Sequence, residues 1–208
     1  TTLDDKKYYY NLIEQCVANS KKICTVSEAS RSDIEKLFPR SKGKVFNTYQ
    51  SVFGRAPSEM QSIVELKRDL EGLFSLNYEG YLLYFGAIEP KKNVGRLIEA
   101  YLSSKLETPL IIVGSKAWKS DEELALFHSL QASSPRLSEK VRFMGYLPQT
   151  FLIKLIRGAK AVAFPSLYEG FGLPVLAAMQ LGTPTVCSNE GSLQEIAGTA
   201  SLLIDPYD

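Results

Sequence analysis

A glycine-rich turn between an apolar strand and a helix is the stretch of this sequence best suited to chemistry. The strand is expected at Ala161–Pro165, the turn at Glu169–Gly172, and the helix after it has Pro174 in its first turn and ends at Gly182. A helix start has unpaired N–H groups and about half a positive charge, so it attracts phosphate. Glu169 adds a carboxylate that can accept hydroxyl protons. The turn predicts a site for phosphate joined to a hydroxylated group, or else a βα turn that needs glycine only for geometry.

Glycine also follows the expected strands that end near Phe85, Val113 and Met144, so four successive strands end in an open turn. Such turns can form a floor against which a ligand lies, although each alone can be a tight turn. Lys92 follows the first of these strands and precedes a helix whose start is expected to face the cleft. We therefore expect its ammonium group on a diphosphate; the alternative is a solvated pair of lysines, Lys91 and Lys92.

The cysteines and the single histidine do not predict a catalytic or metal site. Cys16, Cys24 and Cys187 lack metal-ligand spacing, and we expect them to be reduced core thiols. His128 lies in a helix-like run far in sequence from the glycine turns, so we expect it on the surface.

The second part of the chain has the pattern of a parallel sheet. Apolar runs predict strands at 81–85, 110–113, 141–144, 161–164, 184–187 and 201–204, and helices are expected to begin near Asn93, Ser120, Gln149, Pro174 and Ser192. Continuously apolar strands that alternate with helices indicate an α/β, Rossmann-like sheet covered by helices on both faces. Its ligand site is expected at the carboxyl ends of the strands.

The first part of the chain is too short for a sheet domain of its own. Residues 1–52 predict a helix at Tyr8–Val17, a strand at Lys22–Val26, a helix at Ser30–Phe38 and a strand at Lys44–Tyr49. Two strands do not form an independent sheet of any size, so we interpret this segment as the tail of another domain. Residues 53–78, with a helix at Ser58–Leu70, are expected to be a linker, and residues 79–208 the ligand-binding domain.

The composition argues against a nucleic-acid-binding protein and against a membrane-spanning one. The net charge of +1 over 208 residues argues against a nucleic-acid partner, and the apolar runs have strand length, so none is expected to span a membrane. The chain begins at Thr1 without a signal-peptide pattern, and we interpret this start as a cut into a longer protein.

These motifs together resemble a known family. Ser166–Gly182, with Lys92 upstream, Ser188–Pro206 downstream and Thr25–Arg31 near the front, is similar to retaining glycosyltransferases of family 4, which have the GT-B fold of two Rossmann-like domains. The resemblance implies transfer of a hexose from a nucleoside diphosphate sugar to a hydroxyl, with retention and without a cofactor or an obligatory metal. Residues 1–52 would then close the acceptor domain.

The resemblance also implies roles for residues. Glu169 matches the first glutamate of the family signature, which contacts the donor sugar, and Lys92 matches the lysine of the diphosphate site; both are our candidate catalytic residues. The base is expected near Gly145 to Leu147, where Tyr146 can stack on it. The full set of expected donor-binding positions is Gly86, Ala87, Gly114, Ser115, Gly145, Tyr146, Leu147, Gly170, Phe171, Gly172, Leu173 and Ala177.

Two positions depart from the family pattern. The second signature glutamate, which binds the ribose, falls on Ala177, and an arginine of the diphosphate site falls on Ala87. Alanine accepts no hydrogen bond from a ribose, so Ala177 is open to three interpretations: other ribose contacts, a degenerate domain, or an engineered substitution.

The family context suggests the surroundings of the protein. We expect a nucleotide-sugar donor, with GDP-mannose favoured over UDP-sugars, a saccharide or lipid-linked acceptor, and a missing N-terminal domain or partner chain. The expected location is the cytoplasm, peripheral to the inner membrane face. A nucleotide-sugar 2-epimerase would need acid and base carboxylates or a histidine in the cleft, and the sequence offers only His128 and scattered acidic residues. A non-catalytic nucleotide-sugar-binding subunit stays open because of Ala177.

Overall fold

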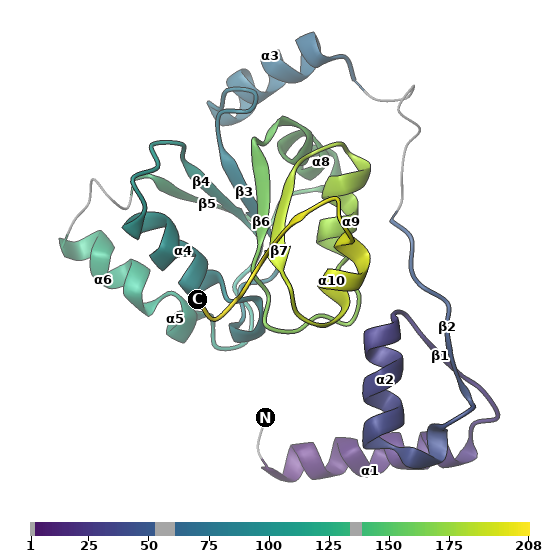
Figure 1. Cartoon of the computed structure of the whole chain (residues 1–208). Helices are drawn as coiled ribbons and strands as arrows, with labels where there is room; N and C mark the ends of the chain where they lie inside the picture. The colour runs from purple at the N-terminus through teal and green to yellow at the C-terminus, as the bar shows by residue number, and fades with distance from the viewer. Residues whose placement is uncertain (1–2, 53–60, 134–138) are drawn as a thin grey trace. The chain divides into compact units, whose positions relative to one another are not determined.

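The chain folds as two compact units in the computed structural model, which describes residues 3–52, 61–133 and 139–208 (Figure 1). The first unit is Thr1–Ser51 and the second is Val52–Asp208. Each unit is described on its own below.

The first unit contains α1 Leu3–Asn19, β1 Ile23–Thr25, α2 Glu28–Leu37, the short 3-10 helix η1 Pro39–Ser41, and β2 Val45–Asn47. The two strands are parallel and pair from Ile23–Val45 to Thr25–Asn47. The order of elements is as predicted, but both helices begin earlier. The side chain of Ser27, and not that of Ser30, caps α2, because its oxygen accepts the N–H of Ser30 at 3.0 Å.

The second unit is built on six parallel strands. In chain order it contains α3 Ile63–Phe74, β3 Leu82–Phe85, η3 Pro90–Lys92, α4 Val94–Ser103, β4 Leu110–Val113, α5 Ser120–Glu123, α6 Ala125–Ser133, β5 Val141–Gly145, α8 Gln149–Gly158, β6 Ala161–Phe164, α9 Leu173–Gln180, β7 Thr185–Ser188, α10 Gly191–Ala197 and β8 Leu202–Ile204. The strand order across the sheet is β5-β4-β3-β6-β7-β8. The chain therefore winds outward from β3 to one edge and then from β6 to the other, which is the doubly wound Rossmann order.

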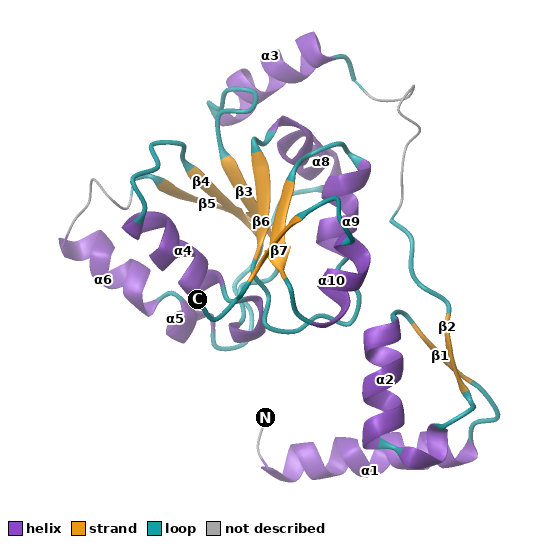
Figure 2. Ribbon diagram, in the orientation of Figure 1, coloured by secondary structure: helices purple, strands orange, loops and turns teal. Residues whose placement is uncertain are grey.

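Helices cover both faces of this sheet, as Figure 2 shows and as the sequence predicted. Alternate residues of one strand enter different cores: Leu110 and Ile112 pack with side chains of α4 and α6, whereas Ile111 and Val113 pack with side chains of α3 and α8. A strand buried on both faces must be apolar at every position. That requirement explains why short apolar runs in the sequence predict these strands.

The helix of the predicted linker is part of the second unit. It begins at Ile63 and not at Ser58, because Ser62 and Glu65 form a capping box. Asp69 of this helix pairs with Lys154 of α8 at 2.5 Å, and Leu66 and Leu70 are fully buried. Residues 61–78 are thus packed on the sheet domain, while residues 53–60 of the predicted linker lie outside the described residues.

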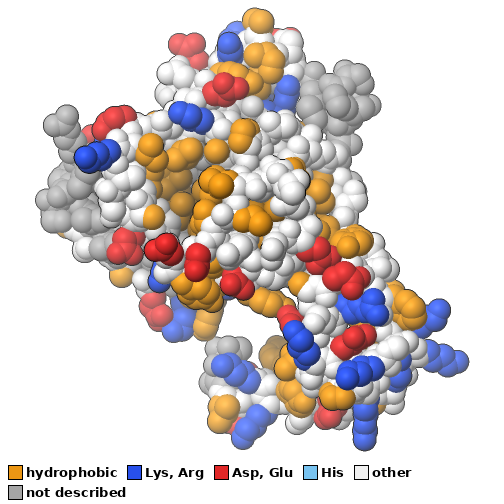
Figure 3. Space-filling model, in the orientation of Figure 1, with side chains coloured by type: hydrophobic (Ala, Val, Ile, Leu, Met, Phe, Trp, Pro, Cys, Tyr) orange, Lys and Arg blue, Asp and Glu red, His pale blue; other side chains and the backbone are white. Residues whose placement is uncertain are grey.

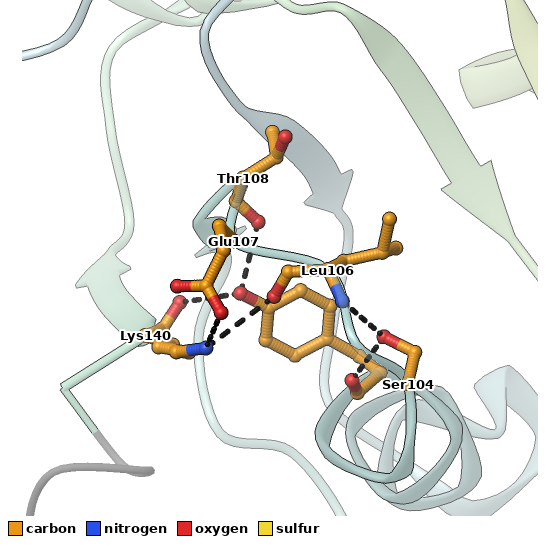
Figure 4. Close-up of polar contacts among 6 residues, drawn as sticks. Ser104, Leu106, Glu107, Thr108 and Lys140 are labelled. Atoms are coloured by element: carbon orange, nitrogen blue, oxygen red, sulfur yellow. Dashed lines mark hydrogen bonds and ion pairs between the residues drawn. The ribbon is translucent and has the colours of Figure 1, made fainter.

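The amino-terminal edge of the sheet is held by bonds that serve the fold (Figure 4). The Tyr101 hydroxyl donates to the Thr108 carbonyl at 2.9 Å, and Lys140 pairs with Glu107 at 2.9 Å, just before β4 and β5 begin. Burial raises the pKa of the Tyr101 hydroxyl, so it remains a neutral donor. A substitution at this edge can therefore lower the stability of the fold without changing residues at the carboxyl ends of the strands.

Two of the three cysteines contradict the expectation of core thiols. Cys16 and Cys24 are exposed, and Cys187 is buried on β7, where burial raises the pKa of its thiol. Cys24 lies on a two-stranded sheet, which buries fewer side chains than the six-stranded one. His128 is exposed on α6, as predicted.

The described surface carries mixed charge. On the face in Figure 3, acidic and basic side chains are interspersed. Among the described helices, none has both the length and the apolar character needed to cross a membrane.

The carboxyl ends of β3 and β4 are locked by direct backbone contact. The N–H of Gly86 donates to the Val113 carbonyl at 2.9 Å, and that of Gly114 donates to the Gly145 carbonyl at 2.8 Å. A Cβ atom added to Gly114, which has a φ of +152°, would lie 1.8 Å from the carbonyl oxygen of Gly86. Backbone atoms cannot rotate away as a side chain can, so only glycine fits at this position.

We therefore expect Gly114→Ala to lower the free energy of unfolding by several kcal/mol, of which about 1–3 comes from strain and about 1–3 from overpacking. Gly182→Ala is the matched control, because Gly182 also has a positive φ of +77° but nothing within 4 Å of an added Cβ. The free energy of unfolding of Gly182→Ala should fall only by the contribution from backbone strain. Urea unfolding of both variants measures the difference, and equal losses would contradict the close approach at Gly114.

Candidate functional site

The candidate site lies where the strand order reverses, between β3 and β6. Only Leu82 and Leu83 of β3 pair with β6, whereas β3 and β4 pair along four residues. Beyond this short pairing, the rings of Tyr84 and Phe164 stack at 5.7 Å with an interplanar angle of 10°. A ligand crevice is expected at such a reversal, outside the carboxyl ends of the strands.

The two predicted catalytic residues meet at this reversal of the strand order. Lys92 ends η3 after β3, Glu169 lies in the loop after β6, and the Lys92 Nζ is 2.5 Å from the Glu169 Oε1. The two side chains are only 13% and 11% exposed, and the Lys92 Nζ lies 5.3 Å from the centroid of the Phe164 ring. Sequence reasoning placed each residue at a strand end but did not predict this contact across 77 positions.

The starts of two helices near the crevice differ in what they leave open. At α4, the Glu123 carboxylate accepts the N–H of Gly95 at 2.8 Å, so part of the first turn is already satisfied. At α9 the residue before the first turn is Gly172, at a φ of 110°, which has no side chain to cap the helix. Pro174 has no N–H, so the first-turn donors of α9 are on Leu173 and Val175. The start of α9 can therefore serve as an anion site. The expectation that the start of the helix after Lys92 faces the cleft stays a prediction.

The turn that carries Glu169 is shaped by its packing. A Cβ added to Gly172 would lie 2.7 Å from the Cδ2 of Leu193 on α10. Phe171 is 5% exposed and Leu173 is 41% exposed, while Gly170 is half-buried. The positive φ and the contact with Leu193 together favour glycine at position 172, whether or not a ligand approaches it.

The loops after β3, β4 and β5 form the expected base side of the site. The Tyr84 hydroxyl donates to the Ala87 carbonyl at 3.0 Å, and the Ile88 N–H donates to the Ser115 carbonyl at 3.0 Å. Burial raises the pKa of the Tyr84 hydroxyl far above its usual value, and the negative charge of Glu169 adds to the rise. Tyr84 is therefore a neutral donor that fixes the Gly86–Ala87 turn.

The turn after β5 is the most accessible of these loops. Tyr146 is 79% exposed, which leaves its ring available for stacking, and Leu147 packs against the core on the α8 face. A Cβ added to Gly145 would have nothing within 4 Å. The expected roles of these residues in binding a base stay predictions.

Ala177 lies one turn into α9 and is half-buried against the core cluster that contains Leu155 and Ala178. The sequence suggested that Ala177 lies on the first turn of the helix. Because α9 begins at Leu173, Ala177 instead lies at the start of the second turn. The methyl group of Ala177 therefore contributes to packing and supplies no acceptor to the site.

Three residues near the pair were not assigned a role by sequence reasoning. The Asn93 side-chain amide donates to the carbonyls of Pro165 and Pro206, at 3.2 and 2.8 Å. The Ser188 Oγ donates to the Ser166 carbonyl at 2.6 Å, and the Ser192 Oγ donates to the Glu169 carbonyl at 2.7 Å. Small polar residues at helix starts and at the end of a strand were the available signal, but their partners are distant in sequence.

No group of three or more metal-ligating side chains occurs within residues 3–52, 61–133 and 139–208. At the strand-order reversal, the Lys92 ammonium is a cation that the described geometry can offer to an anionic ligand.

Comparisons with known proteins agree with this architecture. The chain is 34% identical over 213 residues to O-antigen chain mannosyltransferase B from Escherichia coli, covering 99% of this chain and 53% of that protein. It is 30% identical over 208 residues to the serotype-specific mannosyltransferase WbdA from Escherichia coli, covering 98% of this chain and 25% of that protein. The chain thus spans about half or less of these relatives.

A solved structure shares the fold. HepE from Anabaena, crystallised with UDP and glucose, matches with a TM-score of 0.78 at 20% identity, over 99% of this chain and 54% of that one. Residues 73–208 match the sequence model of a family described as Glycosyl transferases group 1. The chain therefore has the fold of the GT-B glycosyltransferases and belongs to the family Glycosyl transferases group 1.

Proposed function

We propose that the second unit is the donor-binding domain of a retaining hexosyltransferase that acts in polysaccharide or lipid-linked saccharide synthesis. The single observation that carries the proposal is the Lys92–Glu169 pair, which lies at the strand-order reversal that also leads to the start of α9 after Gly172. A cation, helix N–H groups and a carboxylate are the chemistry needed for a diphosphate joined to a sugar.

In this proposal the two charges have separate tasks. The Lys92 ammonium and the N–H groups of Leu173 and Val175 neutralise the leaving diphosphate, a task otherwise suited to a metal, by electrostatic preorganisation. The Glu169 carboxylate accepts hydroxyl protons of the sugar, and the base lies along Gly145 to Leu147. No cofactor has a part in this assignment.

The favoured donor is GDP-mannose, because two relatives are named mannosyltransferases. A UDP-sugar is the competing donor, because the HepE crystals contain UDP and glucose. The proposed acceptor is a growing saccharide or a lipid-linked saccharide at the cytoplasmic face of the inner membrane, and the rest of a longer protein or a partner chain would supply the acceptor side.

A second candidate function is a nucleotide-sugar-binding subunit without catalysis. Ala177 favours it, because the position that would hold the ribose carries a methyl group. Calorimetric titration with GDP-mannose and UDP-glucose, followed by a transfer assay, separates the two functions. Binding without transfer in the complete protein would support the second candidate.

We expect Lys92→Ala to weaken binding of GDP by roughly 1–3 kcal/mol, the range for a charge-assisted hydrogen bond, with little change for guanosine. The loss has a second source, because the variant leaves Glu169 as an uncompensated, nearly buried carboxylate beside the phosphates. Adding Glu169→Gln to Lys92→Ala should therefore recover part of the GDP affinity. Calorimetry with both ligands measures each effect.

Lys91→Ala is the matched control. Lys91 is the adjacent lysine, and its side chain is 55% exposed and pairs with Glu89 at 3.3 Å. Its loss should leave GDP binding within about twofold, because exposed pairs contribute at most about 1 kcal/mol. Equal losses of GDP and guanosine affinity in Lys92→Ala would show that Lys92 acts through folding.

We expect Ala177→Glu to raise the affinity for GDP about tenfold, because a new carboxylate gains roughly 1.5–3 kcal/mol per ribose hydrogen bond and loses up to about 2 in side-chain ordering. The gain should vanish for the 2′,3′-dideoxy nucleotide, which has no hydroxyl to donate. Gln180→Glu, on the exposed end of the same helix, adds the same charge as a control. Unchanged or weaker GDP binding would mean that residue 177 does not reach the ribose.

The 208-residue chain alone should bind donor but transfer no sugar, because its first unit has only two paired strands and would leave the acceptor side incomplete. Incubating the purified chain with labelled GDP-mannose and an acceptor saccharide tests this. Multiple turnover by the partner-free chain would overturn the expectation.

A further inference from the structure

We propose that Asn93 is a positioning residue that fixes Lys92 against the loop carrying Glu169. This inference rests on the proposed function of Lys92 as the cation of the diphosphate site. Asn93 is 7% exposed, follows Lys92 directly, and contacts two segments that are remote in the sequence.

The backbone of Asn93 turns the chain between two helices. Its φ and ψ are 59° and 35°, in the left-handed region, and it separates η3 from α4. The Asn93 N–H donates to the Pro90 carbonyl at 3.1 Å, and the Asn93 carbonyl accepts the N–H of Leu97 at 3.1 Å. Asparagine and glycine enter this region more readily than most other residues. The turn stops η3 at Lys92 and so decides where the lysine leaves the backbone.

The side chain of Asn93 uses both of its donors. The amide nitrogen donates to the Pro165 carbonyl in the loop after β6, and to the Pro206 carbonyl in the segment after β8. A primary amide carries two N–H groups on one nitrogen, whereas aspartate carries none and glycine has no side chain. Asn93 therefore combines a left-handed backbone with a double donor.

The residues before and after Lys92 are both hydrogen-bonded to the loop after β6. The Leu167 N–H donates to the Lys91 carbonyl at 2.8 Å on one side, and Asn93 holds the Pro165 carbonyl on the other. Both partners belong to the loop that leads to Glu169. The backbone of Lys92 is thus set relative to this loop by flanking residues, which restricts where a long and flexible lysine side chain can reach.

A purely structural role would give a different result from a positioning role. If Asn93 only stabilises the fold, its loss should lower the free energy of unfolding and affect GDP and guanosine alike. If it positions Lys92, its loss should affect GDP selectively, and only while Lys92 is present. The coupling between the two residues is therefore the decisive measurement.

The test compares GDP and guanosine binding by calorimetry in the full chain and in the variants Lys92→Ala, Asn93→Gly and the double variant. Asn93→Gly keeps access to the left-handed backbone and removes only the amide. It should weaken GDP binding about 5- to 30-fold, the factor for one or two kcal/mol, with guanosine within twofold. In the Lys92→Ala background the same change should have no further effect.

Tyr101→Phe is the matched control, because it also removes a side-chain bond to a backbone carbonyl, but at the opposite edge of the sheet (Figure 4). It should lower the melting temperature without changing GDP binding. Asn93→Asp is the second variant if Asn93→Gly does not fold, since it keeps the shape and the left-handed tolerance and lacks both donors.

The outcomes separate the two proposals. If Lys92→Ala weakens GDP binding but the Asn93 variants do not, or if their effect persists without Lys92, the positioning role is overturned and the proposed function stands. If Lys92→Ala leaves GDP binding unchanged, the diphosphate role of Lys92 fails, and the positioning role fails with it.

Discussion

The limited pairing between β3 and β6 is the constraint on which the rest of the site depends. These strands are the first of each half of the sheet, and they pair only at Leu82 and Leu83 before their carboxyl ends part. Beyond these pairs, the ring of Tyr84 on β3 stacks on the ring of Phe164 on β6. The two loops that leave this point carry the opposite charges of the site. The sheet sets where these loops begin, and the bonds of Lys91 and Asn93 to the loop after β6 hold them together.

The contact between Lys92 and Glu169 has an electrostatic consequence for ligand binding. The two charges cancel at short range in a nearly buried setting, so the crevice presents little net field to an approaching ligand. Under the proposed function, selectivity for a diphosphate sugar would come from exchange of partners at close range, in which phosphate oxygens replace the carboxylate at the ammonium and sugar hydroxyls replace the ammonium at the carboxylate. Such an exchange favours a ligand that carries both groups over one that carries either alone.

The sequence predicted the elements of the sheet better than the contacts between them. Runs such as Leu110–Val113 are apolar at every position because both faces are covered, and their bounds were read directly. The start of α2 was misplaced because Ser27 and Ser30 are both good caps, and only the backbone conformation distinguishes them. Glu169 and Lys92 could be identified locally, but their contact depends on strand order, which no local pattern encodes. The partners of Asn93, at Pro165 and Pro206, were hidden for the same reason.

The turns at the carboxyl edge also differ in how freely their sequences can change. Gly114 is confined by a neighbouring backbone, whereas the space beside Gly145 is open and Tyr146 next to it points into solvent. A substitution at the first position must be matched by a shift of the chain after β3, but one at the second costs only the left-handed strain of about 1–2 kcal/mol. Substitutions are therefore tolerated more readily in the turn after β5 than in the turn after β4. If Gly145 to Leu147 hold the base, as proposed, a change of nucleotide preference can arise there in single steps while the residues at β3 and β6 stay the same.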